Sequence, residues 1–154
     1  MMGRMKDWRR AGAADAERLR DLERAANVVG LVDVFGGRPF PDAEVLARWR
    51  ETLADRGVTV LMTDVSFTSW DLDGRLRHLA VHPDHWGTGL ARVGVELAVA
   101  GIRSGGGTPR LWVLADNHRA CGLYQHLGWV ATGREQQAEW PPYPVELELT
   151  LPPT

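Results

Sequence analysis

The stretch LRHLAVHPDHWGTGLAR, residues 76–92, decides the fold of this chain. It begins with a short apolar run, Leu76–Val81, which has the length and composition of a buried strand. Pro83 ends that run, because proline cannot donate to a sheet ladder and the residue before it avoids helical angles. A glycine-spaced turn over 86–91 follows, and from Leu90 onward apolar residues recur at helical spacing. The stretch therefore predicts a strand, a turn and the start of a helix.

The predicted helix start is suited to bind an anion. The first N–H groups of a helix have no partner within the helix and carry partial positive charge, which suits a phosphate or pyrophosphate. Glycines in the turn remove side chains that would keep the anion at a distance. Two nearby glycines before a helix are also the pattern of an ordinary tight turn, and the spacing is neither GxGxxG nor that of a P-loop. From the residues alone, both interpretations stay open.

Length and composition fit one globular domain that spans residues 1–154. A hydrophobic content of 44% and a charged content of 25% are those of an ordinary soluble protein. The net charge of −2 gives no electrostatic attraction to nucleic acid or to acidic lipid. We therefore expect neither nucleic acid nor a membrane among the partners of this chain.

Several further features predict a cytoplasmic protein without a metal site. A single cysteine, Cys121, excludes an internal disulfide, fits a reducing compartment and is expected to be an inert core thiol. No apolar run approaches the ~18 residues needed to span a bilayer. Basic residues near the start are not followed by the apolar stretch of a secretion signal. His82 and His85 flank a tight turn but lack an evident third ligand, so we expect no metal there.

The rest of the chain alternates predicted helices and strands. In chain order, the sequence predicts a short strand at 7–11, a helix from Asp15 to Val29, an apolar loop at 30–41, a helix from Asp42 to Arg56, strands at 58–62, 66–70 and 76–81, a helix from Leu90 to Gly101, a strand at 111–114, a helix from Asn117 to Leu127, and strands at 129–132 and 145–151. The alternation predicts an α/β fold of mixed α+β type, with helices packed on a sheet. Hairpins at both ends predict a mixed sheet and not an all-parallel one.

A second stretch, LWVLADNHRACGLYQHLGW at residues 111–129, carries side chains suited to chemistry. It predicts a strand, then Asp116 or Asn117 as a helix cap, then a helix with Tyr124 seven residues after Asn117. This order, closed by Leu-Gly-aromatic, resembles the second conserved block of the GCN5-related N-acetyltransferases, the GNAT family.

The glycine turn resembles the other block of the same family. Trp86-x-x-Gly89-x-Ala91 corresponds to the family's Q/R-x-x-G-x-G/A turn, with Trp86 where glutamine or arginine is usual. Two separate blocks in the right order are far more specific than either one alone.

The GNAT resemblance implies both a fold and a co-substrate, acetyl-CoA. The resemblance implies a mixed, mostly antiparallel sheet that is splayed, so strands 76–82 and 111–114 are expected to diverge and to hold acetyl-CoA in the gap. The pantetheine arm would hydrogen-bond the freed strand backbone, and the pyrophosphate would lie on the amides of the turn. The residues that the resemblance implies for cofactor binding are Leu79, Ala80, Val81, Gly87, Thr88, Gly89, Leu90, Ala91, Arg92 and Asn117. A role as helix cap alone also explains Asn117.

Tyr124 is the residue that the resemblance implies for catalysis. The implied reaction transfers an acetyl group from acetyl-CoA to a primary amine of a small molecule, peptide or protein, by direct attack of the amine on the thioester. A phenol of pKa ~10 is protonated at neutral pH, so Tyr124 would be the general acid to the thiolate, whose conjugate acid has a pKa near ~8.5. A backbone N–H near Val81 would stabilise the oxyanion. The alternative is that Tyr124 only packs beside Leu123 and Leu127.

A general base is harder to assign. Some relatives carry a glutamate five residues before the helix-capping asparagine, and Trp112 stands there in this chain. His78 on the central strand is a candidate, directly or through water, and its alternative is a structural role. Glu135 and Glu139 are further candidates, and the amine could also reach the site already neutral.

The acceptor amine and the oligomeric state stay open. The acceptor is expected to contact two variable segments, 28–41 and 135–143, whose aromatic residues suggest an apolar component. Those aromatic residues are Phe35, Phe40, Trp140 and Tyr143. An exposed last strand could pair across a homodimer or simply form an edge.

Two further function classes also stay open. A non-catalytic acyl-CoA-binding sensor or structural module would share the cofactor site without turnover, and Trp86 and Trp112 are the reasons to consider it. A nucleotide-binding protein would use the glycine turn alone, but the turn lacks the lysine and acidic partners that such ligands need.

Overall fold

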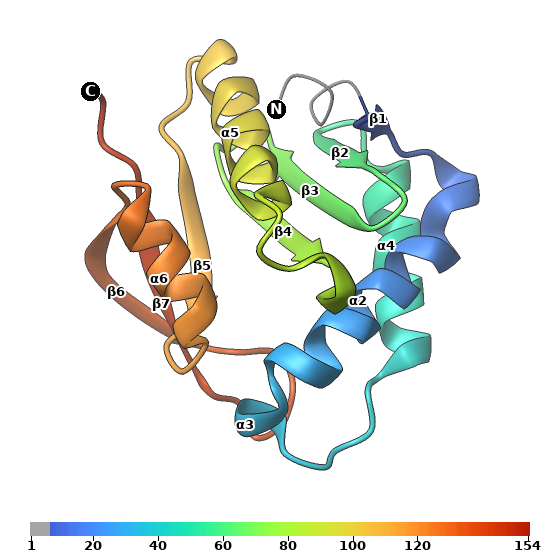
Figure 1. Ribbon diagram of the computed structural model, residues 1–154. Coiled ribbons are helices and arrows are strands. Elements are labelled where there is room, and N and C mark those ends of the chain that lie inside the picture. Colours follow the sequence, from blue (N-terminus) through green and yellow to red (C-terminus); the bar gives the residue numbers. More distant parts are fainter. Residues whose placement is uncertain (1–6) are drawn as a thin grey trace.

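The computed structural model describes residues 7–154, and its helices lie on both sides of a central β-structure (Figure 1). In chain order the elements are β1 (Arg9–Arg10), η1 (Ala13–Asp15), α2 (Ala16–Gly30), α3 (Val32–Phe35), α4 (Asp42–Ala54), β2 (Val58–Met62), β3 (Ser66–Asp71), β4 (Leu76–Val81), η2 (Pro83–His85), α5 (Leu90–Ser104), β5 (Arg110–Leu114), α6 (His118–His126), β6 (Val130–Gln137) and β7 (Val145–Thr150). The helices and strands predicted from the sequence are therefore present in the predicted order.

Two antiparallel sheets meet between β4 and β5. The first sheet has the strand order β1-β2-β3-β4, and the second has the order β5-β7-β6. An isolated parallel bridge between Arg75 and Arg110 joins the start of β4 to the start of β5. Beyond this bridge the two strands diverge, as Figure 1 shows. The predicted mostly antiparallel arrangement with splayed central strands is confirmed.

A β-bulge bends β4 where the gap opens. Ser69 of β3 lies opposite His78, but the next residue, Trp70, lies opposite Leu76, so Arg77 is the extra residue on β4. A bulge of this kind bends its strand and increases the local twist. The bulge therefore lies where β4 turns away from β5.

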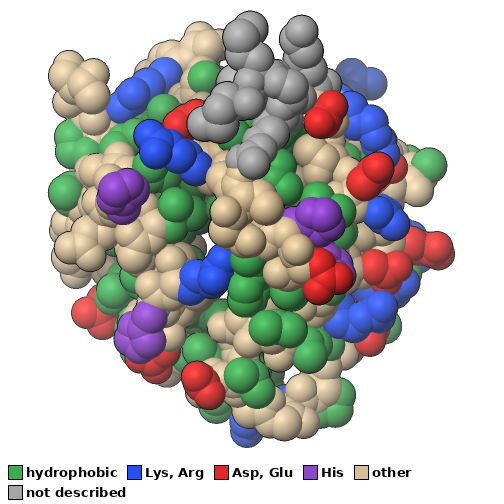
Figure 2. Space-filling view, in the orientation of Figure 1, with side chains coloured by type: hydrophobic (Ala, Val, Ile, Leu, Met, Phe, Trp, Pro, Cys, Tyr) green, Lys and Arg blue, Asp and Glu red, His purple; other side chains and the backbone are tan. Residues whose placement is uncertain are grey.

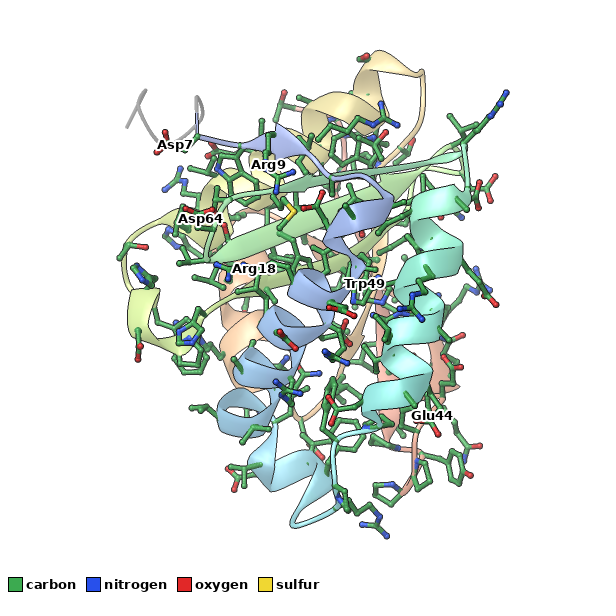
Figure 3. The ribbon with its side chains drawn as sticks, turned by 90° about the vertical axis from the view of Figure 1, so that its right-hand side faces the viewer. Asp7, Arg9, Arg18, Glu44, Trp49 and Asp64 are labelled. Atoms are coloured by element: carbon green, nitrogen blue, oxygen red, sulfur yellow. The ribbon has the colours of Figure 1, made fainter. Side chains whose placement is uncertain are left out.

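Helices α2 and α4 lie side by side over one face of the first sheet, and α5 covers the other face (Figures 1 and 3). Trp49 of α4 packs edge-to-face on Phe67 of β3, with 5.0 Å between the ring centroids. The core on this face consists of Ala16, Leu19, Leu22, Val45, Trp49, Val58, Val60, Met62 and Phe67. A second core packs α5 and α6 against β5 and β7, through Leu76, Val95, Ala98, Leu111, Val113, Tyr124, Trp129 and Leu149.

Helix α5 does not end at Gly101, as the sequence predicted, but continues to Ser104. A Cβ atom at Gly101 would lie 2.3 Å from the ring of Trp70, and one at Gly94 would lie 2.6 Å from Leu79 Cδ1. These glycines therefore let the helix approach the sheet closely. The prediction was wrong because it interpreted a packing glycine as a helix end.

The C-terminal hairpin also differs from its prediction. β6 continues to Gln137, well beyond the predicted end at 132, although its sequence lacks the apolar alternation of a half-buried strand. Its register with β7 shifts between Ala131 and Glu135, around Gly133, whose φ is +91°. Because β7 lies between β5 and β6, the exposed edge is β6 and not the last strand of the chain.

Two connections are more ordered than the sequence indicated. The apolar loop predicted at 30–41 contains the single helical turn α3. The short link between β2 and β3 closes through its own residues: the Thr63 N–H donates to the Ser66 carbonyl at 2.9 Å, and the Val65 N–H donates to Thr63 Oγ1 at 3.2 Å. These bonds explain how three residues can connect the two strands.

The described surface shows no single sign of charge on the face drawn in Figure 2, where acidic and basic side chains are interspersed. Across residues 7–154, every helix is too short or too polar to cross a membrane.

Candidate active site

Two cavities meet where β4 separates from β5. The larger has a volume of about 970 Å³, and the smaller has a volume of about 360 Å³. Both are lined by residues of α2, β4 and α6 together with Leu31, and the shared residues are Asn27, Leu31, Leu79, Ala80, Asn117, Ala120 and Tyr124. A molecule in one cavity can therefore contact a molecule in the other beside Tyr124.

The smaller cavity brings together the residues that the sequence assigned to the cofactor. Its lining includes Leu79, Ala80, Val81, Gly87, Thr88, Gly89, Leu90, Ala91, Arg92 and Asn117, with Tyr124 beside them. The geometry is thus compatible with one extended ligand that contacts β4, the glycine turn and α6.

The backbone of β4 offers alternate residues to the gap. The His82 N–H donates to the Val65 carbonyl at 2.7 Å, which makes this a hydrogen-bonded pair of the antiparallel ladder. Bonded and non-bonded pairs alternate along such a ladder. The backbone groups of Ala80 are therefore directed to β3, whereas those of Leu79 and Val81 are directed to the gap. Ala80 nevertheless lines both cavities.

The turn before α5 has the geometry of an anion-binding helix start. Gly87 and Gly89 have φ values of +79° and +85°, in the left-handed region that favours glycine. Thr88 Oγ1 donates to the His85 carbonyl at 2.6 Å and closes the turn. Gly89 is the N-cap of α5 and makes no side-chain cap bond, so the first N–H groups of this helix stay available.

Asn117 and Tyr124 are positioned by α6. Asn117 Oδ1 accepts the Ala120 N–H at 3.2 Å, so Asn117 and not Asp116 is the cap of this helix. Tyr124 packs edge-to-face on Trp129, with 5.6 Å between the ring centroids. Burial raises the pKa of the Tyr124 phenol above its ordinary value, with a smaller contribution from Cys121. The phenol is therefore protonated at neutral pH.

The larger cavity is lined by both charged and aromatic side chains. Arg48 Nη2 forms a close ion pair with Glu23 Oε1, which also accepts Trp49 Nε1–H at 2.9 Å. His78 lies nearby, with its ring centroid 5.5 Å from that of Trp49. Burial lowers the pKa of His78 well below its ordinary value, and the positive charges of Arg48 and Arg77 lower it further. His78 is therefore a neutral imidazole at physiological pH.

Of the four aromatic residues expected near the acceptor, three line the larger cavity and one does not. Phe35, Phe40 and Trp140 line the larger cavity. Tyr143 does not line it and is 52% exposed. Of the other candidate bases, Glu139 lines the cavity and Glu135 does not.

The structure also shows the surroundings of Cys121 and His82, to which the sequence assigned no chemistry. Cys121 is half-buried, and burial raises its pKa, which agrees with the expected inert thiol. His82 Nδ1 accepts the Asp84 N–H at 3.1 Å. In the described part of the chain, no group of three His, Cys, Asp or Glu residues is placed to hold a metal ion.

Three residues that line the cavities were not singled out from the sequence: Glu23, Arg48 and Arg119. Glu23 lies four residues after Leu19 on the buried side of α2, and a carboxylate in an apolar stripe was the available signal. Arg48 pairs with it from α4, and Arg119 stacks on Trp86 from α6. Neither contact has a signature in the linear sequence, because each depends on packing between elements.

Comparisons with known proteins agree with this geometry. The profile of the family described as "FR47-like protein" matches residues 46–140. Among curated proteins, none matches this sequence.

Solved structures share the fold at low sequence identity. The apo form of YjaB from Escherichia coli has a TM-score of 0.73 and 20% identity, over 96% of this chain and 97% of that one. A GCN5-related N-acetyltransferase from Rhodopseudomonas palustris also has a TM-score of 0.73, with 18% identity over 94% and 93% of the two chains. The PaiA N-acetyltransferase from Thermoplasma acidophilum, solved with coenzyme A, has a TM-score of 0.68 and 13% identity over 92% and 96%.

The family match covers more than half of the residues, and the splayed sheet with its glycine turn and capped helix is the predicted GNAT arrangement. The chain therefore belongs to the FR47-like family and has the fold of the GCN5-related N-acetyltransferases.

Proposed function

We propose that this protein transfers an acetyl group from acetyl-CoA to a primary amine of a small molecule, peptide or protein. The observation that carries the proposal is the junction of the two cavities beside Tyr124, between β4 and α6. The smaller cavity would hold the cofactor, and the larger cavity would hold the acceptor. Direct attack of the amine on the thioester then takes place at the junction.

The cofactor would bind mainly to the main chain. Its pantetheine arm lies along β4 and bonds the gap-facing backbone groups of Leu79, in place of a neighbouring strand, while the Val81 N–H stays free for the thioester oxygen. Its pyrophosphate lies on the N–H groups between Gly87 and Arg92, at the positive end of α5. Asn117 uses Oδ1 for the helix cap, which leaves its amide nitrogen to donate to the cofactor.

Tyr124 would act on the departing thiolate. Attack of the amine gives a tetrahedral oxyanion, which the Val81 N–H stabilises. Collapse breaks the carbon–sulfur bond, and the sulfur then needs a proton or a strong hydrogen bond. Burial disfavours the Tyr124 phenolate, but it disfavours a thiolate in the same site as well. Tyr124 therefore donates a hydrogen bond first and transfers its proton only as the thiolate becomes desolvated.

His78 is the side chain best placed to receive the proton of the attacking amine. It lines the acceptor cavity on β4, one residue before Leu79, and its imidazole is neutral. The lowered pKa makes it a weak base, so it serves best when the amine has lost its first proton before the attack.

The acceptor would carry an apolar or aromatic part. Phe35, Phe40 and Trp140 line the larger cavity, together with charged groups of both signs. Such walls bind an apolar body, and a few polar groups set its orientation.

The test is thiol release from acetyl-CoA in the presence of a panel of amines, with the acetylated product identified by mass spectrometry. We expect amine-dependent release, with the fastest turnover for amines that carry an apolar group. Tight binding of coenzyme A without turnover on any amine would instead support a non-catalytic acyl-CoA sensor. Absence of coenzyme A binding would contradict both functions.

A further inference from the structure

Trp86 and Arg119 form a contact that joins the two halves of the molecule on the cofactor side. Trp86 follows η2 after β4, and Arg119 lies in the first turn of α6 after β5. The Arg119 guanidinium carbon lies 3.9 Å from the centroid of the Trp86 ring, within cation–π range. Both side chains line the smaller cavity. The stack is therefore part of the wall that faces the proposed cofactor.

The Trp86 ring is held in a defined position. Its Nε1–H donates to the Val81 carbonyl at 2.8 Å. Its far edge faces Gly30, where an added Cβ would lie 3.6 Å from Cη2. The ring thus provides a fixed platform for a long, flexible arginine side chain. The bond also occupies the Val81 carbonyl, so only the Val81 N–H is left for a ligand in the gap.

The charge of the smaller cavity depends on Arg119. No Asp or Glu is found among the described residues that line this cavity. Its other arginine, Arg92, is paired with Glu96 at 3.0 Å. Among the ion pairs of residues 7–154, none involves Arg119. Of the two arginines that line this cavity, Arg119 is therefore the one without an ion-pair partner among the described residues.

We propose that Arg119, held on the Trp86 ring, binds the diphosphate of coenzyme A. This inference rests on the proposed function, which identifies the cofactor. A guanidinium stacked by its face keeps its edge N–H groups free, and these match phosphate oxygens in geometry and charge. The diphosphate is the assigned group because Arg119 shares one cavity with the backbone amides from Gly87 to Arg92. Trp86 acts as a positioning residue through Arg119.

The contact with Arg119 explains why a tryptophan stands at position 86. Glutamine or arginine is usual there in the GNAT turn, and this chain carries tryptophan. The tryptophan replaces a polar side chain of the turn by a platform for an arginine from α6.

The experiment is calorimetric titration of the whole protein with coenzyme A, 3′-dephospho-coenzyme A and pantetheine, which carries no phosphate. In Arg119→Ala, affinity for the first two ligands should fall about tenfold to a hundredfold, as for loss of a hydrogen bond between charged groups. Affinity for pantetheine should not change. Arg50→Ala, which removes an exposed arginine of α4 outside both cavities, is the matched control.

A second variant tests the platform. Trp86→Leu should weaken coenzyme A binding about twofold to fivefold, the size of an exposed cation–π contact. In the Arg119→Ala background the same change should have little further effect, because Trp86 then has nothing to position. Equal, independent losses in both backgrounds would contradict the positioning role.

The outcomes separate this inference from the function on which it rests. If the unaltered protein binds no coenzyme A, the proposed function fails. If the unaltered protein and Arg119→Ala bind coenzyme A equally, only the assignment of Arg119 is overturned. A loss for coenzyme A that is absent for the 3′-dephospho form would move Arg119 to the ribose phosphate. A loss that includes pantetheine would show a general disturbance of the site, and either result overturns the proposal.

Discussion

The two cavities differ in what builds them. The smaller is formed largely by two short stretches, the end of β4 with its glycine turn and the start of α6, and it includes the free N–H groups of that turn. The larger collects side chains from α2, α3, α4, β4, β5 and the β6–β7 segment. Backbone groups of a turn suit a cofactor that is common to many enzymes. A cavity lined by side chains from many elements can instead be adapted to a new substrate by substituting single residues. This difference supports the proposal that the first cavity holds the cofactor and the second holds the acceptor.

Removal of the phenol at the junction should have the largest effect. Tyr124→Phe should lower kcat about 10²- to 10⁴-fold, the usual range for loss of a general acid. The affinity for coenzyme A, measured by calorimetry, should stay the same because the ring remains. Tyr143→Phe changes the other tyrosine, which lies outside both cavities, and is the matched control. A kcat for Tyr124→Phe close to that of the control would leave Tyr124 as a packing residue only.

The backbone character of the smaller cavity can be tested at Gly89. Gly89→Ala places a side chain at a φ of +85°, which costs about 1–2 kcal/mol in the left-handed region. If the turn relaxes and must be restored on binding, coenzyme A affinity falls about fivefold to thirtyfold.

The control for this strain is Gly133→Ala. Gly133 has a φ of +91° in the β6 bulge and lines neither cavity. Thermal unfolding should show similar destabilisation in both variants, and calorimetry should show weaker cofactor binding only for Gly89→Ala. Weaker binding in both would point to a loss of global stability instead.

The side-chain character of the larger cavity can be tested at Phe35. Phe35→Ala should raise the KM of the best acceptor about threefold to tenfold, because it removes apolar contact area. The KM for acetyl-CoA should not change. Tyr143→Ala removes an exposed aromatic residue from the other acceptor segment and should leave both constants unaltered. A larger effect for Tyr143→Ala than for Phe35→Ala would contradict the assignment of this cavity to the acceptor.

The smallest expected effect concerns the stability of the acceptor side at low pH. His78 is neutral in the fold, whereas in the unfolded chain it binds a proton near its ordinary pKa of 6.5. Below pH 6.5 the unfolded state therefore binds more protons, and the free energy of unfolding falls by up to about 1 kcal/mol per pH unit.

The measurement is thermal unfolding between pH 7.5 and 5. The Tm of the unaltered protein should fall more steeply than that of His78→Gln, by about 2–4 °C per pH unit at this chain length. Parallel curves for the two proteins would mean that His78 binds its proton equally well in the folded and unfolded states, which would contradict the lowered pKa.

The difference between patterns within one stretch and contacts between elements explains how much of the site could be predicted from the sequence. Gly87 and Gly89 are marked by the local pattern of a strand and a turn, and Asn117 and Tyr124 by that of a capped helix; the family resemblance, not local spacing, predicted that the two pairs meet. Glu23 and Arg48 meet because α2 packs on α4, and Trp86 meets Arg119 across the splayed strands. No local pattern encodes such contacts. Gly101 was misinterpreted for the same reason, since its cause is the ring of Trp70 on β3.

The proposed mechanism depends most directly on the position of the cofactor sulfur relative to Tyr124. A crystal structure of the complex with coenzyme A would measure this position. We expect the diphosphate at the turn before α5, the pantetheine arm along Leu79 and Val81, and the sulfur within about 3.5 Å of the Tyr124 hydroxyl. A cofactor bound in the larger cavity, or a sulfur out of hydrogen-bond reach of Tyr124, would contradict the account.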